Sequence, residues 1–449
     1  MENNLVQFYD AAVPRYTSYP TAPHFSPEVD NDIYRNWLQE LDPAKPLSLY
    51  LHVPYCRQMC WYCGCHTKIT AQDNPIKFYA NALRSEIRML IKALPTRFSV
   101  SHVHWGGGTP SILSSEDFIS IMDLIDQNFD YTQDAERAIE IDPRTVDALK
   151  IEALAKGGVN RASLGIQDFN PVVQTAINRV QSFDVTKQAV ENLRANGITH
   201  INFDLMYGLP LQSSDDVRRT VELSHSLQPD RIALFGYAHV PWMKSHMKMI
   251  QDGDLPGTVA RVEHAKSAAE ELIRLGYQQI GLDHFALPDD NMCKALVGNN
   301  LNRNFQGYTT DQSETLIGIG ASSIGSLPQG YAQNIVSIHE YERQILNNEF
   351  AISKGIMINT EDKIRREVIE RLMCDLTVDL DDILTKFGKP KSFFSEEISR
   401  LQSLEKVGLL VLKDNRVTVE EDVRFLVRNV CAVFDTYLGT GAGRYSRAI

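Results

Sequence analysis

Residues 56–65 read Cys56-Arg57-Gln58-Met59-Cys60-Trp61-Tyr62-Cys63-Gly64-Cys65 and contain four of the seven cysteines of the chain. The first three of them follow the spacing C-x3-C-x2-C. Three thiolates on a short irregular loop can bind three irons of a cubane cluster and leave the fourth iron open to a ligand. Structural zinc sites usually need a second pair of ligands, and disulfides suit small secreted chains, whereas the remaining cysteines here stand singly. The spacing therefore favours an iron–sulfur cluster over zinc or disulfide bonds.

Outward from this loop, short β-rich runs alternate with amphipathic helical runs. The predicted strands cover residues 47–53, 100–105, 137–141, 161–166, 200–205 and 231–235, and the first of them leads into the cysteine loop. Helical patterns lie between them, at about 76–94, 115–128, 144–156, 183–196 and 214–226. β-α units in this order imply a parallel sheet whose helices lie outside it.

Polar and glycine-rich features occur where each predicted strand ends. Gly106-Gly107-Gly108-Thr109-Pro110 follows the second strand, Glu140 and Asp142 lie at the third, Gln167 follows the fourth, Asp204 ends the fifth, and Tyr237-Ala238-His239 follows the sixth. In β/α barrels the chemistry sits at the carboxyl ends of the strands. We therefore predict, over residues 46–355, an α/β fold with a partial (β/α)6 TIM-like barrel and a site at its C-terminal mouth. The segments at 277–283, 301–309 and 318–324 are expected to close its open side.

Two further regions flank this predicted barrel. Residues 1–45 are predicted to form an N-terminal strap and helix. The two prolines in the stretch 14–21 suit a plain surface strap, whereas its hydroxyl-bearing side chains around one arginine could instead cover an anionic ligand. Residues 356–449 are predicted to form a smaller, mostly helical, winged-helix-like C-terminal domain, because helical patterns at 361–373, 378–387 and 392–404 precede a two-stranded hairpin at 409–419. This region lacks a basic face, which favours a lid over DNA binding. The glycine-rich end, 439–449, is predicted to be a flexible tail.

Length and composition set the broad class of the protein. A chain of 449 residues with 43% hydrophobic and 23% charged residues is typical of a globular protein of two or three domains. The start, Met-Glu-Asn-Asn-Leu, lacks the features of a secretory signal, and no apolar run is long enough to cross a bilayer, so a cytoplasmic protein without a membrane partner is expected. A net charge of −12 argues against a nucleic-acid partner.

The cysteine spacing is the signature of radical S-adenosylmethionine enzymes. With Tyr50-Leu51-His52-Val53-Pro54-Tyr55 before the loop and Gly64-Cys65 in it, the chain resembles the oxygen-independent coproporphyrinogen III oxidase (dehydrogenase) family over nearly its whole length. The resemblance implies that Cys56, Cys60 and Cys63 are the ligands of a [4Fe-4S] cluster. It also implies that Cys65 lies near the site without being a ligand, and that the strap and helix of residues 1–45 lie over the active site.

The resemblance further implies two molecules of S-adenosylmethionine, one bound to the cluster and a second beside it. Residues implied around the cluster-bound molecule are Tyr50, Gly107, Glu140 and Ile324. Residues implied around the second are Tyr62, Gly108, Thr109, Gln167, Arg179, Asp204 and Ala238. Taken singly, Asp204 could be a helix cap, Arg179 a surface residue and the glycines a tight connection. Their common position at one rim favours the functional interpretation.

The activity implied by the resemblance is oxidative decarboxylation of two propionate side chains of coproporphyrinogen III to vinyl groups, giving protoporphyrinogen IX in anaerobic haem biosynthesis. Tyr50 and Cys65 are the catalytic candidates, although a thiol such as Cys65 can equally be a packing residue. Arg15, Tyr16 and Arg303 are candidates for binding the substrate carboxylates. The expected partner is an electron donor such as flavodoxin or ferredoxin, and a monomer is expected. A radical enzyme acting on haem, or a haem-binding chaperone of the same superfamily, are the alternatives, and the 14–21 stretch together with Cys65 disfavours both.

Overall fold

The computed structural model of the protein describes residues 6–9 and 11–440. The first five residues, on which the expectation about a secretory signal rests, lie outside the described part, as does most of the predicted tail, at 441–449. Among the described residues, no helix combines the length and the apolar character that a membrane span requires.

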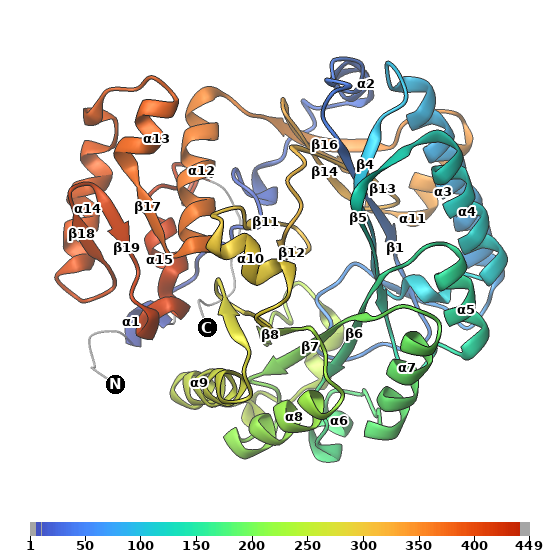
Figure 1. Cartoon of the computed structure of the whole chain (residues 1–449), viewed down its shortest axis with the longest axis horizontal. Coiled ribbons are helices and arrows are strands. Elements are labelled where there is room, and N and C mark those ends of the chain that lie inside the picture. The colour runs from blue at the N-terminus through green and yellow to red at the C-terminus, as the bar shows by residue number, and fades with distance from the viewer. Residues whose placement is uncertain (1–5, 10, 441–449) are drawn as a thin grey trace.

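Six parallel strands form the centre of the molecule, in the spatial order β1-β4-β5-β6-β7-β8 (Figure 1). Their bounds are β1 Leu47–Val53, β4 Ser99–Gly107, β5 Asp130–Ile141, β6 Arg161–Gln167, β7 His200–Tyr207 and β8 Arg231–Gly236. Helices between and after them lie on the outside of the sheet: α3 Asn74–Ala93, α4 Ser115–Asn128, α5 Ala148–Lys156, α6 Pro171–Ala176, α7 Phe183–Ala195, α8 Ser214–Ser226 and α9 Thr258–Arg274. The predicted partial barrel with its parallel strands is confirmed.

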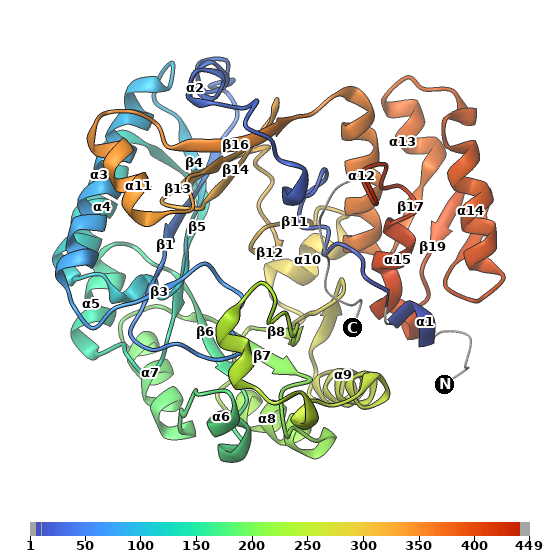
Figure 2. The same ribbon diagram turned by 180° about the vertical axis from the view of Figure 1, so that it is seen from behind.

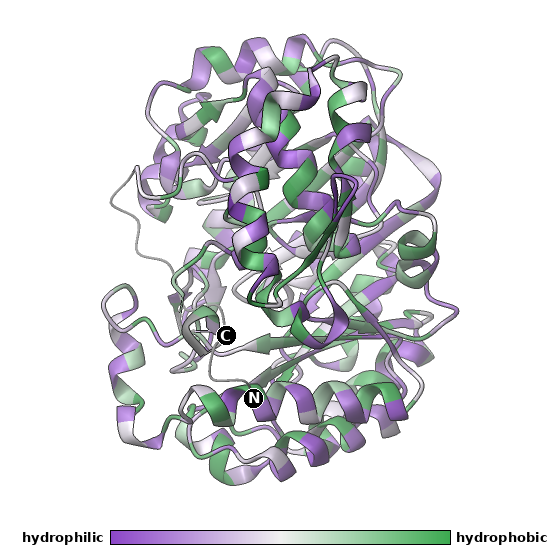
Figure 3. Ribbon diagram, turned by 90° about the vertical axis from the view of Figure 1, so that its left-hand side faces the viewer, coloured by the Kyte–Doolittle hydropathy of each residue, from purple (hydrophilic) through white to green (hydrophobic). Residues whose placement is uncertain are grey.

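Local sequence signals set where the helices begin. The Ser114 hydroxyl accepts a hydrogen bond from the backbone of Asp117 at the start of α4. At α8, Ser213 and Asp216 form a reciprocal capping box, which satisfies two backbone N–H groups that a helix start leaves without partners. Figure 3, which faces the C-terminal domain, shows hydrophilic and hydrophobic residues alternating along the helices, as expected for helices with one buried face.

The expectation that later segments close the barrel is wrong. The central sheet is open and has twelve strands, ending in β16 on one side and β9 on the other. Next to β1 it continues through β13 (Thr315–Ile319), which is parallel, and then through antiparallel β14 (Ile324–Leu327), β15 (Gly330–Asn334) and β16 (Ile352–Met357). Next to β8 it continues through β10 (His284–Ala286) and β9 (Gln278–Ile280), while β11 (Asn302–Asn304) and β12 (Gly307–Thr309) form a separate hairpin. Strands β13 to β16 therefore extend one edge of the sheet, and β10 and β9 extend the other, instead of joining the two edges.

The C-terminal region is a small helical domain with a winged-helix-like order of elements. Its elements are α12 Thr360–Asp375, β17 Thr377–Asp379, α13 Leu380–Lys386, α14 Ser395–Glu405, β18 Val411–Lys413, β19 Arg416–Thr418 and α15 Val427–Cys431. The predicted two-stranded hairpin is in fact a three-stranded sheet in the order β17-β19-β18. The additional strand has three residues, too few to produce a period in the sequence. Its residues fall instead at the start of the helix predicted from residue 378.

The N-terminal segment lies between the barrel and the C-terminal domain (Figure 2). The Tyr19 hydroxyl is 3.0 Å from the Thr436 hydroxyl, and the Tyr16 hydroxyl donates to Asp435 at 3.1 Å. After α2 (Asn31–Gln39) the chain enters β1. The segment therefore bridges the two parts of the molecule.

Candidate active site

The cysteine loop begins directly after β1 and is closed at its base. β2 (Tyr55–Cys56) and β3 (Lys68–Ile69) pair in parallel on its two sides. At its outer end, the backbone N–H of Trp61 donates to the carbonyl of Ile177 at 2.9 Å. These backbone bonds close the base of the loop and tie its outer end to the segment after α6.

The chain after β8 holds the last part of the loop. Lys244 Nζ donates to the carbonyl of Cys65 at 2.9 Å, and His246 Nε2 donates to the carbonyl of Cys63 at 2.8 Å. Both donors lie in or next to a short 3-10 helix at Ser245–Met249. The loop is therefore fixed from both sides of the barrel mouth.

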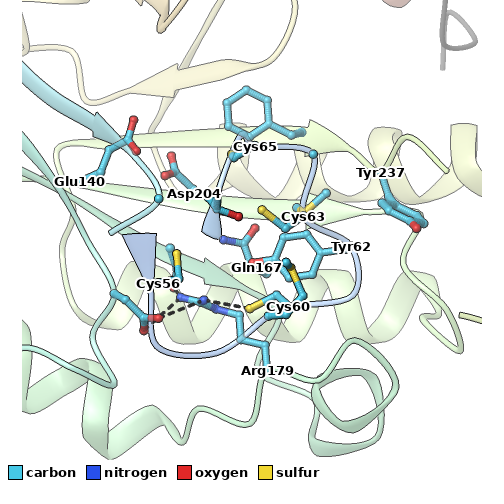
Figure 4. A pocket seen from close by; sticks show the side chains of 18 of the residues that line it. Cys56, Cys60, Tyr62, Cys63, Cys65, Glu140, Gln167, Arg179, Asp204 and Tyr237 are labelled. Carbon is cyan, nitrogen blue, oxygen red and sulfur yellow. Dashed lines mark hydrogen bonds and ion pairs between the residues drawn. The ribbon is translucent and has the colours of Figure 1, made fainter. Parts of the chain in front are cut away.

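The sulfur atoms of the predicted ligands Cys56, Cys60 and Cys63 lie around one space (Figure 4), and all of these cysteines are free thiols. Cys56 Sγ is 3.2 Å from the hydroxyl of Thr109, and burial raises the pKa of Cys56 to about 11. A hydrogen bond from Cys65 lowers the pKa of Cys63 to about 6 and raises that of Cys65. Of these two neighbouring thiols, Cys63 is therefore the one that ionises first.

The glycine turn after β4 packs directly on the start of the cysteine loop. Gly107 has φ +114°, a conformation that L side chains rarely adopt, and its N–H donates to Glu140 at 3.1 Å. Gly108 N–H donates to the carbonyl of Val53 at 2.9 Å. A Cβ at Gly108 would lie only 2.7 Å from the carbonyl oxygen of Tyr55. Glycine is thus needed where the two loops approach each other.

Carboxylate and amide groups line the adjacent strand ends. Gln167, at the end of β6, has φ +68°, which is uncommon for a residue other than glycine. Asp204 lies within β7, so the alternative of a helix cap is wrong. It accepts hydrogen bonds from Ser163 at 3.0 Å and Asn202 at 3.1 Å. Burial, followed by the charge of Glu140, raises the pKa of Asp204 to about 6.

Two arginines contact the sulfur of the middle cysteine. Arg179 Nη1 is 3.5 Å and Arg144 Nη2 is 3.6 Å from Cys60 Sγ. Asp142 pairs with both guanidinium groups, at 2.7 Å from Arg144 and 3.4 Å from Arg179, and Arg179 also donates to the carbonyl of Gly165 at 2.6 Å. Arg179 is 6% exposed, so the alternative of a surface residue is wrong. Two guanidinium groups therefore converge on the sulfur of Cys60.

A cavity of about 600 Å³ brings most of the predicted residues together. All three predicted cluster ligands line it, as does Cys65. So do the seven residues predicted around a second S-adenosylmethionine: Tyr62, Gly108, Thr109, Gln167, Arg179, Asp204 and Ala238.

A second cavity, of about 440 Å³, adjoins the first. Tyr50 lines only this second cavity, where its hydroxyl is 3.0 Å from His52 Nδ1. Ile324, at the start of β14, lines neither cavity. The residues common to both are Cys65, Gly107, Glu140, Ser163, Asp204 and Phe235.

The three candidates for substrate carboxylates lie in different places. Arg15 lines the first cavity. Tyr16 and Arg303 line a separate cavity of about 230 Å³, and the Tyr16 hydroxyl is already engaged by Asp435.

Sequence reasoning did not single out Arg144, Lys244 or His246 as functional residues. For Arg144 a signal existed, because it follows Glu140 and Asp142 at the end of a strand. The segment around Lys244 and His246 has no such signal, since its contacts with the cysteine loop join residues far apart in the chain.

Known proteins resemble this chain over most of its length. The family model of the Radical SAM superfamily matches residues 50–224. The chain is 50% identical to the oxygen-independent coproporphyrinogen III oxidase of Bradyrhizobium diazoefficiens over 444 residues, which cover 99% of each chain. It is 37% identical to the oxidase of Salmonella typhimurium over 448 residues, covering 99% of this chain and 98% of the relative. The solved structure of coproporphyrinogen III oxidase from Escherichia coli, a radical SAM enzyme, superposes with a TM-score of 0.90 at 37% identity and covers 94% of this chain and 98% of that one.

The fold and the cysteine loop thus define a radical S-adenosylmethionine enzyme. The sequence identity over nearly the full length of the relatives defines the family more narrowly. The chain belongs to the oxygen-independent coproporphyrinogen III oxidase family.

Membership of this superfamily implies a [4Fe-4S] cluster and S-adenosylmethionine. The residues present fit both. Three free thiols surround one space, and two guanidinium groups approach one of the sulfurs. The cavity of about 600 Å³ beside these thiols leaves room for a ligand, and the buried Nε of Arg179, which lines it, has no hydrogen-bond partner in the described part of the chain.

Proposed function

We propose that this chain decarboxylates two propionate side chains of coproporphyrinogen III oxidatively to vinyl groups and so forms protoporphyrinogen IX. The observation that carries this proposal is the identity over the full length to enzymes named for that substrate. The position of Cys65 at the junction of the two cavities, beside the three-cysteine loop, supports it.

In this proposal Cys56, Cys60 and Cys63 hold the cluster. With an electron and S-adenosylmethionine, the bound cluster supplies a 5′-deoxyadenosyl radical. A hydrogen atom leaves the propionate carbon β to the carboxylate, the carboxylate departs as carbon dioxide, and one electron passes to an acceptor as each vinyl group forms. Cys65 and Tyr50 are proposed as the catalytic side chains, and we assign Cys65 to proton or hydrogen handling because it faces both cavities.

We also propose that two molecules of S-adenosylmethionine bind. The seven residues assigned to the second molecule share one cavity, which supports a separate site there. Glu140 and Gly107 line both cavities, which supports assigning them to the cluster-bound molecule. We assign Tyr50 and Ile324 to the same molecule. Equilibrium dialysis of the reconstituted protein against labelled S-adenosylmethionine should give about two molecules per chain, and a plateau at one would refute the second site.

The remaining proposals concern partners and setting. We propose a monomer that receives electrons from a small electron-transfer protein such as flavodoxin or ferredoxin, with no nucleic-acid partner given the net charge of −12. Cytoplasmic function is proposed because cluster thiolates need a reducing compartment.

The test is to offer the reconstituted protein coproporphyrinogen III and haem separately, under anaerobic conditions with S-adenosylmethionine and a reductant. Loss of two carboxyl groups from the porphyrinogen, with haem unchanged, is expected. Turnover of haem, or tight binding of haem without any decarboxylation, would refute the proposal and favour one of the two related alternatives.

A further inference from the structure

The turn of residues 320–323, which we call the rim turn, packs on the end of β1 just before the cysteine loop. It connects β13 to β14, and β13 is a parallel neighbour of β1. Gly320 has φ +102°, and a Cβ there would lie 2.5 Å from the carbonyl oxygen of His52. Ser322 has φ +65°, which is uncommon for a residue other than glycine. A turn in such a conformation persists only where the surrounding structure holds it.

A buried tyrosine of the outer helix α3 joins the rim turn to β1. The hydroxyl of Tyr79 donates to the carbonyl of His52 at 2.8 Å. The same hydroxyl accepts a hydrogen bond from the backbone N–H of Ala321 at 2.8 Å. Tyr79 is fully buried, so both hydrogen bonds are shielded from water.

A buried carboxylate two helical turns after this tyrosine holds the other end of the rim turn. Glu86 accepts hydrogen bonds from the N–H of Gly320 at 2.7 Å, the hydroxyl of Tyr341 at 2.5 Å and the amide of Asn334 at 2.7 Å. Tyr341 belongs to α11 (Ile338–Leu346), which lies near α3 in Figure 2. The side chains of α3 that face the sheet therefore fix the rim turn at two points.

The ring of His52 connects this arrangement to the site. Burial lowers the pKa of His52 to about 4, so the ring is neutral at physiological pH. Its Nδ1 is 3.0 Å from the hydroxyl of Tyr50, and a Cβ at Gly107 would lie 2.6 Å from the ring. All three residues line the second cavity. A shift of His52 would therefore displace both Tyr50 and the glycine turn.

We propose that Tyr79 and Glu86 are positioning residues of the active site. They hold the rim turn against the end of β1 and act through His52 on Tyr50 and Gly107. Neither of the two lines the first or the second cavity, so their effect is exerted through these neighbours. This inference rests on the proposed function, in which Tyr50 and Gly107 hold the cluster-bound S-adenosylmethionine. It makes α3, on the outside of the sheet, a determinant of how that molecule binds.

The experiment compares the wild-type protein with its Tyr79→Phe and Glu86→Gln variants after anaerobic reconstitution. Iron content and the thermal midpoint are measured for each. The affinity for S-adenosylmethionine at the cluster is measured from the change that binding causes in the electron paramagnetic resonance spectrum of the reduced cluster. With coproporphyrinogen III present, the ratio of 5′-deoxyadenosine to vinyl groups formed is determined by mass spectrometry.

The matched control is Tyr277→Phe. Tyr277 is also buried, and its hydroxyl donates to a backbone carbonyl, that of Pro229, at 2.9 Å. It lies just before β9 and lines neither the first nor the second cavity. Its variant therefore loses a comparable hydrogen bond away from the site.

Tyr79→Phe leaves the carbonyl of His52 and the N–H of Ala321 without the hydroxyl that joins them. The affinity for S-adenosylmethionine at the cluster should fall about 10-fold, the value of roughly one buried hydrogen bond. 5′-Deoxyadenosine should form in excess over vinyl groups, while iron content stays at the wild-type level. Glu86→Gln keeps an oxygen that can accept from Gly320, so its loss of affinity should be smaller. Tyr277→Phe should lower the thermal midpoint and keep the wild-type affinity and ratio.

Wild-type affinity at the cluster together with a wild-type ratio in Tyr79→Phe would overturn the proposal. An equal loss of affinity in Tyr277→Phe would also overturn it, because the effect would then come from general destabilisation. Should Tyr79→Phe fail to fold, wild-type affinity and ratio in Glu86→Gln would count against the proposal in the same way. Failure of the wild-type protein to decarboxylate the porphyrinogen would refute the proposed function itself, and the affinity at the cluster is measured without that reaction.

Discussion

Replacing Gly108 by alanine should separate the glycine turn from the cysteine loop. The new Cβ would lie 2.7 Å from the carbonyl oxygen and 2.9 Å from the nitrogen of Tyr55, both backbone atoms that cannot rotate away. Ordinary contact begins at 3.4 Å, so the two loops must part by about 0.7 Å (3.4 minus 2.7). That movement stretches the hydrogen bonds from Gly108 to Val53 and from Thr109 to Tyr55, each 2.9 Å.

Overpacking of this kind costs about 1–3 kcal/mol, a factor of about 5 to 140 in an equilibrium constant. We expect the affinity of the Gly108→Ala variant for S-adenosylmethionine to fall within that range, measured by equilibrium dialysis after anaerobic reconstitution. Iron content should stay near that of the wild type, because Cys56, Cys60 and Cys63 move together on one loop.

The control is Gly253→Ala, since a Cβ there meets nothing within 4 Å. This variant should bind S-adenosylmethionine as the wild type does. Wild-type affinity and an unchanged thermal midpoint in Gly108→Ala would refute the packing argument.

Arg144→Met should lower the reduction potential of the cluster, on the order of 50 mV, because it removes a positive charge 3.6 Å from Cys60 Sγ. A redox titration followed by electron paramagnetic resonance measures it, and an unchanged potential would contradict the role of the arginine. Cys65→Ser should keep its iron and lose product formation, whereas Cys60→Ser should lose the cluster; loss of iron from the Cys65 variant would make Cys65 a ligand. Glu86→Gln should change how stability depends on pH, because burial raises the pKa of Glu86 from 4.5 to about 7. The folded state therefore holds a proton that the unfolded state releases, so wild-type stability falls as pH rises from about 4.5 through 7, by about 3 kcal/mol at 1.36 kcal/mol per pH unit. Between pH 5 and pH 8 the thermal midpoint of the wild type should fall relative to that of the glutamine variant. Parallel pH profiles of the two proteins would contradict this explanation.

The parallel strands were predictable because short β-rich runs alternate with amphipathic helical runs along the chain. β1 illustrates this, since it is buried at nearly every position and leads into four closely spaced cysteines. The three-residue strands β9, β10 and β17 were not predictable as strands, because three residues establish no period. Their pairing depends on neighbours supplied by the tertiary fold.

Much of the candidate site could be located from the residues at the carboxyl end of each predicted strand. Gly108, Gln167 and Asp204 were placed at one rim in this way, and the structure brings them to one cavity. The bonds from Lys244 and His246 to the cysteine loop could not be found in the same way, because 179 and 183 residues separate the partners. Such contacts between distant segments are a property of the folded chain alone.

The central claim, removal of a hydrogen atom from the propionate carbon β to the carboxylate, can be tested with substrate deuterated at that carbon. The reconstituted enzyme would be given this substrate, S-adenosylmethionine and a reductant without oxygen, and 5′-deoxyadenosine and the porphyrin products would be analysed by mass spectrometry. We predict vinyl products together with 5′-deoxyadenosine that has gained one deuterium. Vinyl products with unlabelled 5′-deoxyadenosine, or labelled porphyrinogen left intact while S-adenosylmethionine is cleaved, would contradict the claim.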